Sequence, residues 1–189
     1  FVIALSGFLL YRTWSSTRAR VEELTDAQGQ LALEFNLAIR DYAAASIRPA
    51  MADRIDEDEF VVEAMSTSYI SRSIFEKVAK KFPNYIIKFS SDNPRNPANL
   101  AGPEEHTLLE YFREHPDQER WSGKIRMNGN EYFAHLSAMR IEPACLRCHG
   151  RPEDSPQTLL TRYGEEGGFF FQVGDIAGLD VIAIPLDRM

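Results

Sequence analysis

Trp121-Ser-Gly-Lys-Ile-Arg-Met-Asn-Gly-Asn-Glu-Tyr-Phe-Ala-His-Leu-Ser-Ala-Met139 is the stretch from which the fold class can be inferred. Two strand-like runs, Trp121 to Met127 and Glu131 to Met139, lie on either side of the pair Asn128-Gly129. Asn-Gly between two such runs is a strong hairpin signal, because both residues tolerate the backbone angles of a tight turn. The stretch therefore predicts two antiparallel strands joined by a short turn.

The rest of the chain adds two strands and several helices to this hairpin. Runs rich in β-branched and aromatic residues predict strands, and apolar residues at helical spacing predict helices. The predicted strands are Tyr85 to Phe89 and Leu179 to Pro185, and the predicted helices are Val21 to Ala45, Phe60 to Phe82 after the acidic run Asp56-Glu57-Asp58-Glu59, Pro103 to Glu114, and Ser155 to Tyr163. The pattern predicts an α+β fold, an antiparallel sheet with helices around it.

The chain begins with eleven residues that carry no charge and are almost all apolar. This run is too short to cross a bilayer, which takes about 20 residues. Tyr11, Arg12 and Trp14 follow it, and such residues are typical of a membrane interface. We expect residues 1–14 to be the C-terminal part of a transmembrane helix in contact with lipid. A buried core helix and a signal-peptide core remain alternatives.

A helical stalk is expected over residues 15–50, with Pro49 ending or kinking the helix. Its apolar residues form a narrow stripe of heptad type, which suits packing on a partner helix. They are Leu24, Ala27, Leu31, Phe35, Ala38, Tyr42 and Ala45. The stripe predicts either a homodimer seam or an amphipathic helix packed on its own domain, and the pattern leaves both open.

We expect the remaining residues, 51–189, to form one domain, and composition and charge limit what it can be. The 189 residues carry a net charge of −7 and include two cysteines. The negative charge argues against nucleic-acid binding, which needs a basic surface. Two cysteines are too few for a disulfide-rich scaffold, and the chain is long enough to bury a core without one.

Cys145-Leu-Arg-Cys148-His149 is the sharpest motif in the chain, and it uses both cysteines. C-x-x-C-H is the attachment signature of c-type haem. The two thiols bond the porphyrin, and the adjacent histidine is the proximal iron ligand. A zinc site, a redox dithiol and a plain disulfide are weaker alternatives. We therefore expect one covalently attached haem c. Its assembly outside the cytoplasm predicts an inner-membrane protein with one N-terminal anchor and a periplasmic haem domain.

Four stretches resemble a known family. They are Ala64-Met-Ser-Thr-Ser-Tyr-Ile-Ser-Arg-Ser-Ile-Phe75, Lys88-Phe-Ser-Ser-Asp-Asn-Pro-Arg-Asn-Pro-Ala-Asn99, Cys145-Leu-Arg-Cys-His-Gly-Arg-Pro-Glu-Asp-Ser-Pro156 and Gly174-Asp-Ile-Ala-Gly-Leu-Asp-Val-Ile-Ala-Ile-Pro185. Together they resemble the PAS-like c-type haem-binding periplasmic sensor domains, over about residues 30–187. That family supplies input modules of bacterial histidine kinases, diguanylate cyclases and chemoreceptors. The resemblance implies a PAS-like antiparallel sheet with flanking helices and a haem held against it.

The second axial ligand is predicted from this resemblance. Some family members place a cysteine thiolate where this chain has Met65, and methionine would supply another soft sulfur. Core packing of Met65 on its helix is the competing interpretation. The other candidates are His135, Met51 and Met139, or an open site; Met127, His106 and His115 are expected to be solvated.

Arg95 lies in the rigid loop Asn93-Pro-Arg-Asn-Pro-Ala-Asn99. Its guanidinium suits a haem propionate, because it binds carboxylates through two hydrogen bonds. The competing interpretation is an arginine exposed on a turn. Four phenylalanines are candidates for walls of the haem pocket, with ordinary core packing as the alternative: Phe89, Phe169, Phe170 and Phe171.

No catalytic arrangement is visible in the sequence, so we expect a binding protein and not an enzyme. Two functions fit a haem c domain. In the first, a redox change or a small gas at the haem is a sensory input that the N-terminal helix carries to the membrane. In the second, the domain is an electron-transfer subunit of a membrane complex.

Overall fold

The computed structural model describes residues 2–56, 58–127 and 129–186. At its centre lies a four-stranded antiparallel sheet in the order β1-β4-β3-β2. Its strands are β1 (Ile86–Ser90), β2 (Arg120–Met127), β3 (Asn130–Arg140) and β4 (Ile176–Pro185). The predicted hairpin is confirmed, with Met127 opposite Asn130, although Asn128 itself lies outside the described residues. The α+β class and the antiparallel sheet are therefore confirmed.

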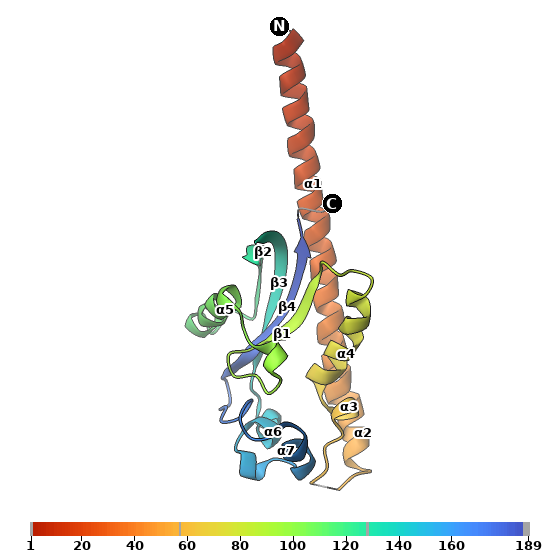
Figure 1. The fold of residues 1–189 in the computed structure, drawn as a ribbon, viewed down its shortest axis with the longest axis vertical. Helices are drawn as coiled ribbons and strands as arrows, with labels where there is room; N and C mark the ends of the chain where they lie inside the picture. The colour runs from red at the N-terminus through yellow and green to blue at the C-terminus, as the bar shows by residue number, and fades with distance from the viewer. Residues whose placement is uncertain (1, 57, 128, 187–189) are drawn as a thin grey trace.

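Helices cover both faces of the sheet. Figure 1 shows α5 (Pro103–Glu114) on one face and α1 (Val2–Tyr42) with α4 (Thr67–Ala79) on the other. Every residue of β4 is buried, because this central strand is covered on both sides. Such a strand reads as a continuous apolar run instead of an alternating one. The hydrophobic core lies between α5 and the sheet, and it includes Leu109, Phe112, Leu136, Leu179 and Val181.

One charged residue interrupts β4 on the face that α1 covers. Asp180 is buried, and its carboxylate lies 2.8 Å from the guanidinium of Arg40 on α1. Asn36 and Ser71 are buried beside them and hydrogen-bond to each other. The side of α1 that meets the sheet is therefore partly polar.

The predicted apolar stripe lies on the side of α1 that faces away from the sheet. Its large members are all more than half exposed: Leu24 at 55%, Leu31 at 59%, Phe35 at 60% and Tyr42 at 62%. The residues of α1 that are buried are Thr25, Gly29, Leu33, Asn36 and Arg40. The interpretation that the stripe packs on its own domain is therefore wrong, because buried polar bonds dock the other side of the helix.

The N-terminal helix continues past its predicted end. After α1, the π-helical turn η1 (Ala43–Ile47) leads directly into α2 (Arg48–Ala52). Pro49 cannot donate to the carbonyl four residues before it, and its ring would clash there in a regular α-helix. The wider π turn relieves this conflict, so the chain passes Pro49 without ending the helix.

None of the helices in the described part of the chain is long and apolar enough to cross a membrane. The membrane segment predicted for residues 1–14 stays a prediction, and Phe1 lies outside the described residues.

The helix predicted from Phe60 to Phe82 is two helices, α3 (Val62–Met65) and α4. Ser66 between them has an extended backbone, and its hydroxyl accepts a hydrogen bond from the amide of Tyr69. A serine in this position favours a helix start over a helix interior. The acidic run before α3 includes Glu57, which lies outside the described residues.

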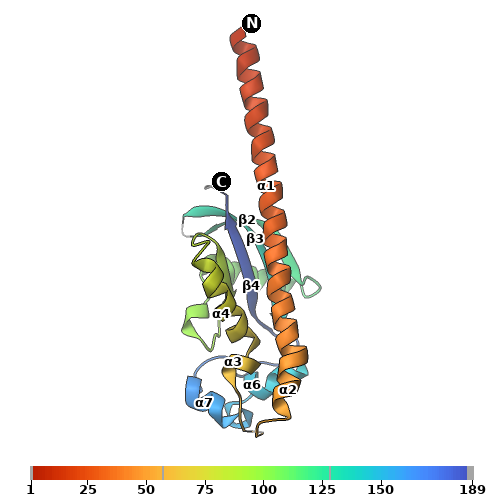
Figure 2. The same ribbon diagram turned by 90° about the vertical axis from the view of Figure 1, so that its right-hand side faces the viewer.

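Four short helices gather at the end of the molecule opposite the projecting N-terminal part of α1 (Figures 1 and 2). They are α2, α3, α6 (Leu146–His149) and α7 (Gln157–Tyr163). Arg162 on α7 forms an ion pair of 2.6 Å with Glu63 on α3. The amide of Phe60 donates to the hydroxyl of Thr158 over 2.7 Å. These contacts join the segment after α2 to the segment that carries the cysteine motif.

Candidate cofactor site

The cysteine motif forms a compact turn after β3. The 3-10 turn η3 (Pro143–Cys145) leads into α6, which contains Cys148 and His149. Both thiols are free and half-buried. Residues three apart on a helical turn lie on the same side of it, so Cys145 and Cys148 can bond one flat group together. The spacing on this turn is the one found in the haem c attachment motif.

His149 is held in the form that binds a metal. Its Nδ1 lies 2.8 Å from the carbonyl oxygen of Gly168, so Nδ1 is the atom that donates a proton to this bond. Nε2 then carries the lone pair, and a second-shell bond of this kind fixes the orientation of a metal-binding imidazole. Burial, together with the positive charge of Arg95, lowers the pKa of His149 to about 4. The ring is therefore neutral at physiological pH.

A loop rich in phenylalanine lies along the end of α6. The amide of Phe170 donates to the carbonyl of Gly150 over 2.7 Å, and the amide of Phe171 donates to that of His149 over 3.1 Å. Phe170 has a φ of 65°, which is a strained backbone for a bulky residue. The Phe171 ring lies edge-on to the imidazole, with the ring centroids 6.2 Å apart. These contacts fix the loop against the motif.

The four candidate phenylalanines occupy different environments. Phe169 is buried, Phe170 is largely exposed and Phe171 is half-buried at His149. Phe89 lies elsewhere, under the guanidinium of Arg40. Their predicted role as walls of a haem pocket stays a prediction, and only Phe171 directly contacts the imidazole ring.

Arg95 joins three segments at the site. Its Nη2 donates to the carbonyl of Cys148 and, over 3.2 Å, to the carbonyl of Gly168. Its guanidinium also lies over the ring of Phe169, 4.5 Å from the centroid. The sequence places Arg95 correctly near the cofactor motif, but this role as a backbone clamp was missed. Binding of a propionate by Arg95 stays a prediction.

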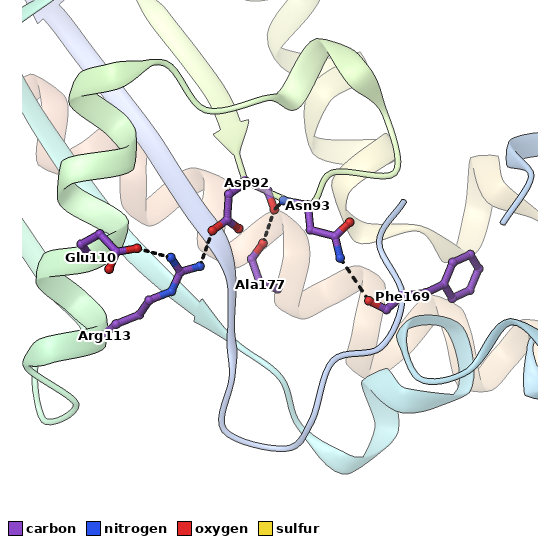
Figure 3. A network of polar contacts seen from close by, with 7 residues as sticks. Asp92, Asn93, Glu110, Arg113, Phe169 and Ala177 are labelled. Carbon is purple, nitrogen blue, oxygen red and sulfur yellow. Dashed lines mark hydrogen bonds and ion pairs between the residues drawn. The ribbon is translucent and has the colours of Figure 1, made fainter. Parts of the chain in front are cut away.

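Asn93 adds a second clamp from the same loop (Figure 3). Its Nδ2 donates to the carbonyl of Phe169 over 3.1 Å, and its Oδ1 accepts from the amide of Gly168 at the same distance. Just before it, Asp92 forms an ion pair of 2.6 Å with Arg113 on α5. The rigid loop is thus anchored to the body of the domain and positions the aromatic loop.

Met65 is linked to the site through Arg48, a residue that the sequence analysis did not single out. Met65 is almost wholly buried. The Nε of Arg48 donates to its carbonyl over 2.6 Å. Burial raises the pKa of Cys148 and lowers that of His149, and the positive charge of Arg48 opposes the first shift and adds to the second. Arg48 is therefore close enough to both residues of the motif to act on them electrostatically. The only signal for Arg48 was its position just before the proline of the helix irregularity.

The other candidate ligands have separate surroundings. Nε2 of His135 lies 3.1 Å from a carboxylate oxygen of Asp26 on α1. The sulfur of Met139 accepts from Arg40 over 3.8 Å. Met51 is half-buried near the end of α2. Met127, the last residue of β2, is buried in the hydrophobic core, so the expectation that it is solvated is wrong. His106 on α5 and His115 at the end of that helix are exposed, as expected.

These donors suit a haem better than a zinc ion. A structural zinc site needs four protein ligands. Among the residues that the structure describes, the one cluster of three metal-binding side chains is exposed and contains neither cysteine. It consists of Asp92, His106 and Glu110. The cysteine motif instead offers two free thiols, one neutral imidazole with a free Nε2, and aromatic surface.

Comparison with known proteins identifies the family. The family model described as Tll0287-like: Tll0287 matches residues 18–185. The chain belongs to the Tll0287-like family. This membership confirms the resemblance drawn from the four sequence stretches. The match begins within α1 and includes the sheet, the rigid loop and the cysteine motif.

A solved structure has the same fold. The structure titled "Crystal structure of the cyanobacterial heme-protein Tll0287" aligns with a TM-score of 0.65 at 18% identity. The alignment covers 87% of this chain and 95% of that one. No curated protein shows significant similarity to the chain.

Proposed function

We propose that the chain is a haem c-binding domain whose haem is the input of a sensor. On this proposal Cys145 and Cys148 attach one haem covalently, and His149 is an axial ligand through Nε2. The hydrogen bond from His149 Nδ1 to the Gly168 carbonyl carries the proposal, because it leaves a neutral imidazole whose Nε2 lone pair can bind the iron. Membership of the Tll0287-like family supports it.

The remaining residues of the site have supporting roles. Arg95 and Asn93 hold the aromatic loop against the motif, and the Phe171 ring of this loop lies edge-on to the imidazole. Met65 is proposed as the second axial ligand, and Arg95 as a partner of a propionate. When bound, the haem supplies an iron that changes its charge by one unit on reduction. The role is binding and not catalysis.

A contact between the site and the N-terminal helix supports sensing. Arg48 lies on α2, which continues α1 through the π turn, and it donates to Met65 while its charge reaches His149. A change in charge at the site therefore acts on a residue of the long helix. In this proposal the helix is anchored in the inner membrane at its N-terminal end, and the domain lies in the periplasm.

Covalent attachment is tested by producing the chain in a bacterium that assembles c-type cytochromes. The wild type should keep its haem on a denaturing gel and after extraction with acidified acetone. A variant with both Cys145→Ser and Cys148→Ser should lose it, with circular dichroism confirming the fold. His149→Gln should keep the haem but change its spectrum. Haem that extracts freely from the wild type would refute the proposal.

Sensing is tested by hydrogen exchange in the oxidised and reduced protein. Reduction should change the protection of amides in η1 and α2, because Arg48 responds to the charge at the site. The distant helix α5 is the internal control and should not change. If exchange changes only within residues 143–150, the sensory part of the proposal is wrong and electron transfer becomes the better explanation.

A further inference from the structure

The outward side of α1 has an apolar surface with no partner among the described residues. Figure 2 shows α1 beside α4, at the edge of the helical layer. Within α1 the stripe consists of Leu24, Ala27, Leu31, Phe35, Ala38 and Tyr42, and its last member, Ala45, lies in η1. No charged residue lies within it between Leu24 and Tyr42. Its four large side chains are all more than half exposed, although the other side of the same helix is docked on the sheet.

We propose that this stripe binds the same stripe of a second copy, so that two α1 helices pack in parallel and form a homodimer. The spacing supports a helix as the occupant. Leu24 and Phe35 are eleven residues apart, and so are Leu31 and Tyr42. Leu24 and Leu31 are seven residues apart, and so are Phe35 and Tyr42, so the stripe combines heptad steps with this eleven-residue spacing. Both are spacings at which two α-helices pack side by side. A helix with the same repeat fits this surface best, and a second copy supplies it.

The charges beside the stripe decide the orientation. At 3.6 residues per turn, one edge carries Glu23 and Asp41, together with Glu34, which also pairs with Arg120. The other edge is uncharged over the same length, with Gln28 and Ile39. In a parallel pair, each acidic edge faces the uncharged edge of the other helix.

An antiparallel pair would bring like charges together. If two copies met with Leu31 of one against Phe35 of the partner subunit, Glu23 would lie near the partner subunit's Asp41. Like charges at facing positions of a helix pair are unfavourable. The charge pattern therefore favours the parallel arrangement, which also leaves both N-terminal segments pointing the same way.

The docked side of α1 explains why the stripe is free for this contact. Arg40 pairs with Asp180, and Asp26 lies 3.1 Å from His135, so polar bonds fix the helix on its own domain. Glu22 adds an ion pair of 2.6 Å with Lys124. None of these bonds uses a residue of the stripe. Dimerisation therefore needs no rearrangement of the domain and does not depend on haem.

The first test measures oligomeric state by sedimentation of the whole chain in a mild detergent, which shields the apolar N-terminal run. The wild type should be a dimer. A variant with Leu31→Glu and Phe35→Glu should raise the dissociation constant by at least about 100-fold. Leu100→Glu is the matched control, because Leu100 is equally exposed at 60% but lies off α1.

Two results of this measurement would overturn the proposal. One is a wild type that stays monomeric at every concentration. The other is a dimer that survives the double substitution, because association would then come from another surface. Haem content and circular dichroism should be unchanged in both variants, so a failure of haem binding is distinguishable from a failure of dimerisation.

The second test measures orientation by disulfide crosslinking. Leu31→Cys should crosslink two copies, because a parallel pair places residue 31 opposite itself. Gln30→Cys is the control and should crosslink poorly, since Gln30 is exposed but lies off the stripe. Equal crosslinking of both variants contradicts the proposal. A mixture of Leu24→Cys and Tyr42→Cys chains that crosslinks preferentially to each other would show the antiparallel pair instead.

Discussion

Replacing Arg95 with methionine removes the guanidinium that joins the rigid loop, α6 and the aromatic loop, while keeping a side chain of similar length. Hydrogen bonds to a charged donor contribute about 1.5–3 kcal/mol each, and a cation over an aromatic ring contributes about 0.5–2 kcal/mol. Arg95 makes two such hydrogen bonds and one such ring contact. Because Arg95 is partly exposed, we take a value just below the sum of the low ends, a loss of about 3 kcal/mol.

Thermal unfolding followed by circular dichroism measures this loss. For a chain of 150–250 residues, 1 kcal/mol corresponds to about 2–4 °C, so Arg95→Met should lower Tm by about 6–12 °C. Arg151→Met is the control, because Arg151 lies nearby but is mostly exposed, with one ion pair of 3.7 Å. If the two variants melt within about 2 °C of each other, the clamp that we assign to Arg95 does not exist.

Four further predictions concern single residues. In the chain produced without haem, the pKa of His149 is about 4 in the folded state, against 6.5 for an ordinary histidine. Between these two pH values the folded state therefore binds fewer protons than the unfolded state. The free energy of unfolding should therefore fall as the pH drops through this window, and urea titrations should show that His149→Gln removes up to about 3 kcal/mol of that fall. Met65→Ala in the haem-loaded protein should abolish the near-infrared band of sulfur-to-iron ligation and lower the midpoint potential; an unchanged band would leave Met65 as a core residue. Arg48→Gln should also lower the midpoint potential in a redox titration, because a nearby positive charge disfavours the ferric state; an unchanged potential would remove Arg48 from the site. Arg40→Met should cost about 3–5 kcal/mol in urea unfolding at pH 7, because Asp180 is left buried without its partner. A second substitution, Asp180→Leu, should recover most of this loss. Since burial raises the pKa of Asp180, the cost of Arg40→Met should shrink as the pH falls and the carboxyl becomes protonated.

Local signals in the sequence were sufficient for the sheet and for the cysteine motif. The hairpin follows from its Asn-Gly turn, and the last strand follows from a run that is apolar except for Asp180, which the burial of all of β4 explains. The helix from Pro103 to Glu114 was predicted with its observed ends, because a proline and two glutamates mark its start. These elements depend on neighbouring residues, so a single sequence is enough to find them.

Long-range bonds were the part that the sequence could not supply. Which side of α1 is buried depends on Asp180, which lies 140 positions after Arg40 and pairs with it across the interior. An apolar stripe ordinarily marks the buried side of a helix, and here this rule fails because buried polar bonds dock the other side. The clamp by Arg95 was missed for the same reason, since its acceptors are backbone carbonyls of distant segments.

The π-helical turn Ala43–Ile47 sets the angular phase between the two parts of the N-terminal helix. Each residue of an α-helix advances the chain by about 100° around the axis. Deleting one residue from Ala43-Ala-Ala45 would therefore swing Arg48 by roughly that angle relative to α1, away from the carbonyl of Met65. The register of the outward stripe would stay the same. Changing the length of this one turn would therefore alter the contact between Arg48 and Met65, while the sequences of the cysteine motif and of α1 stay the same.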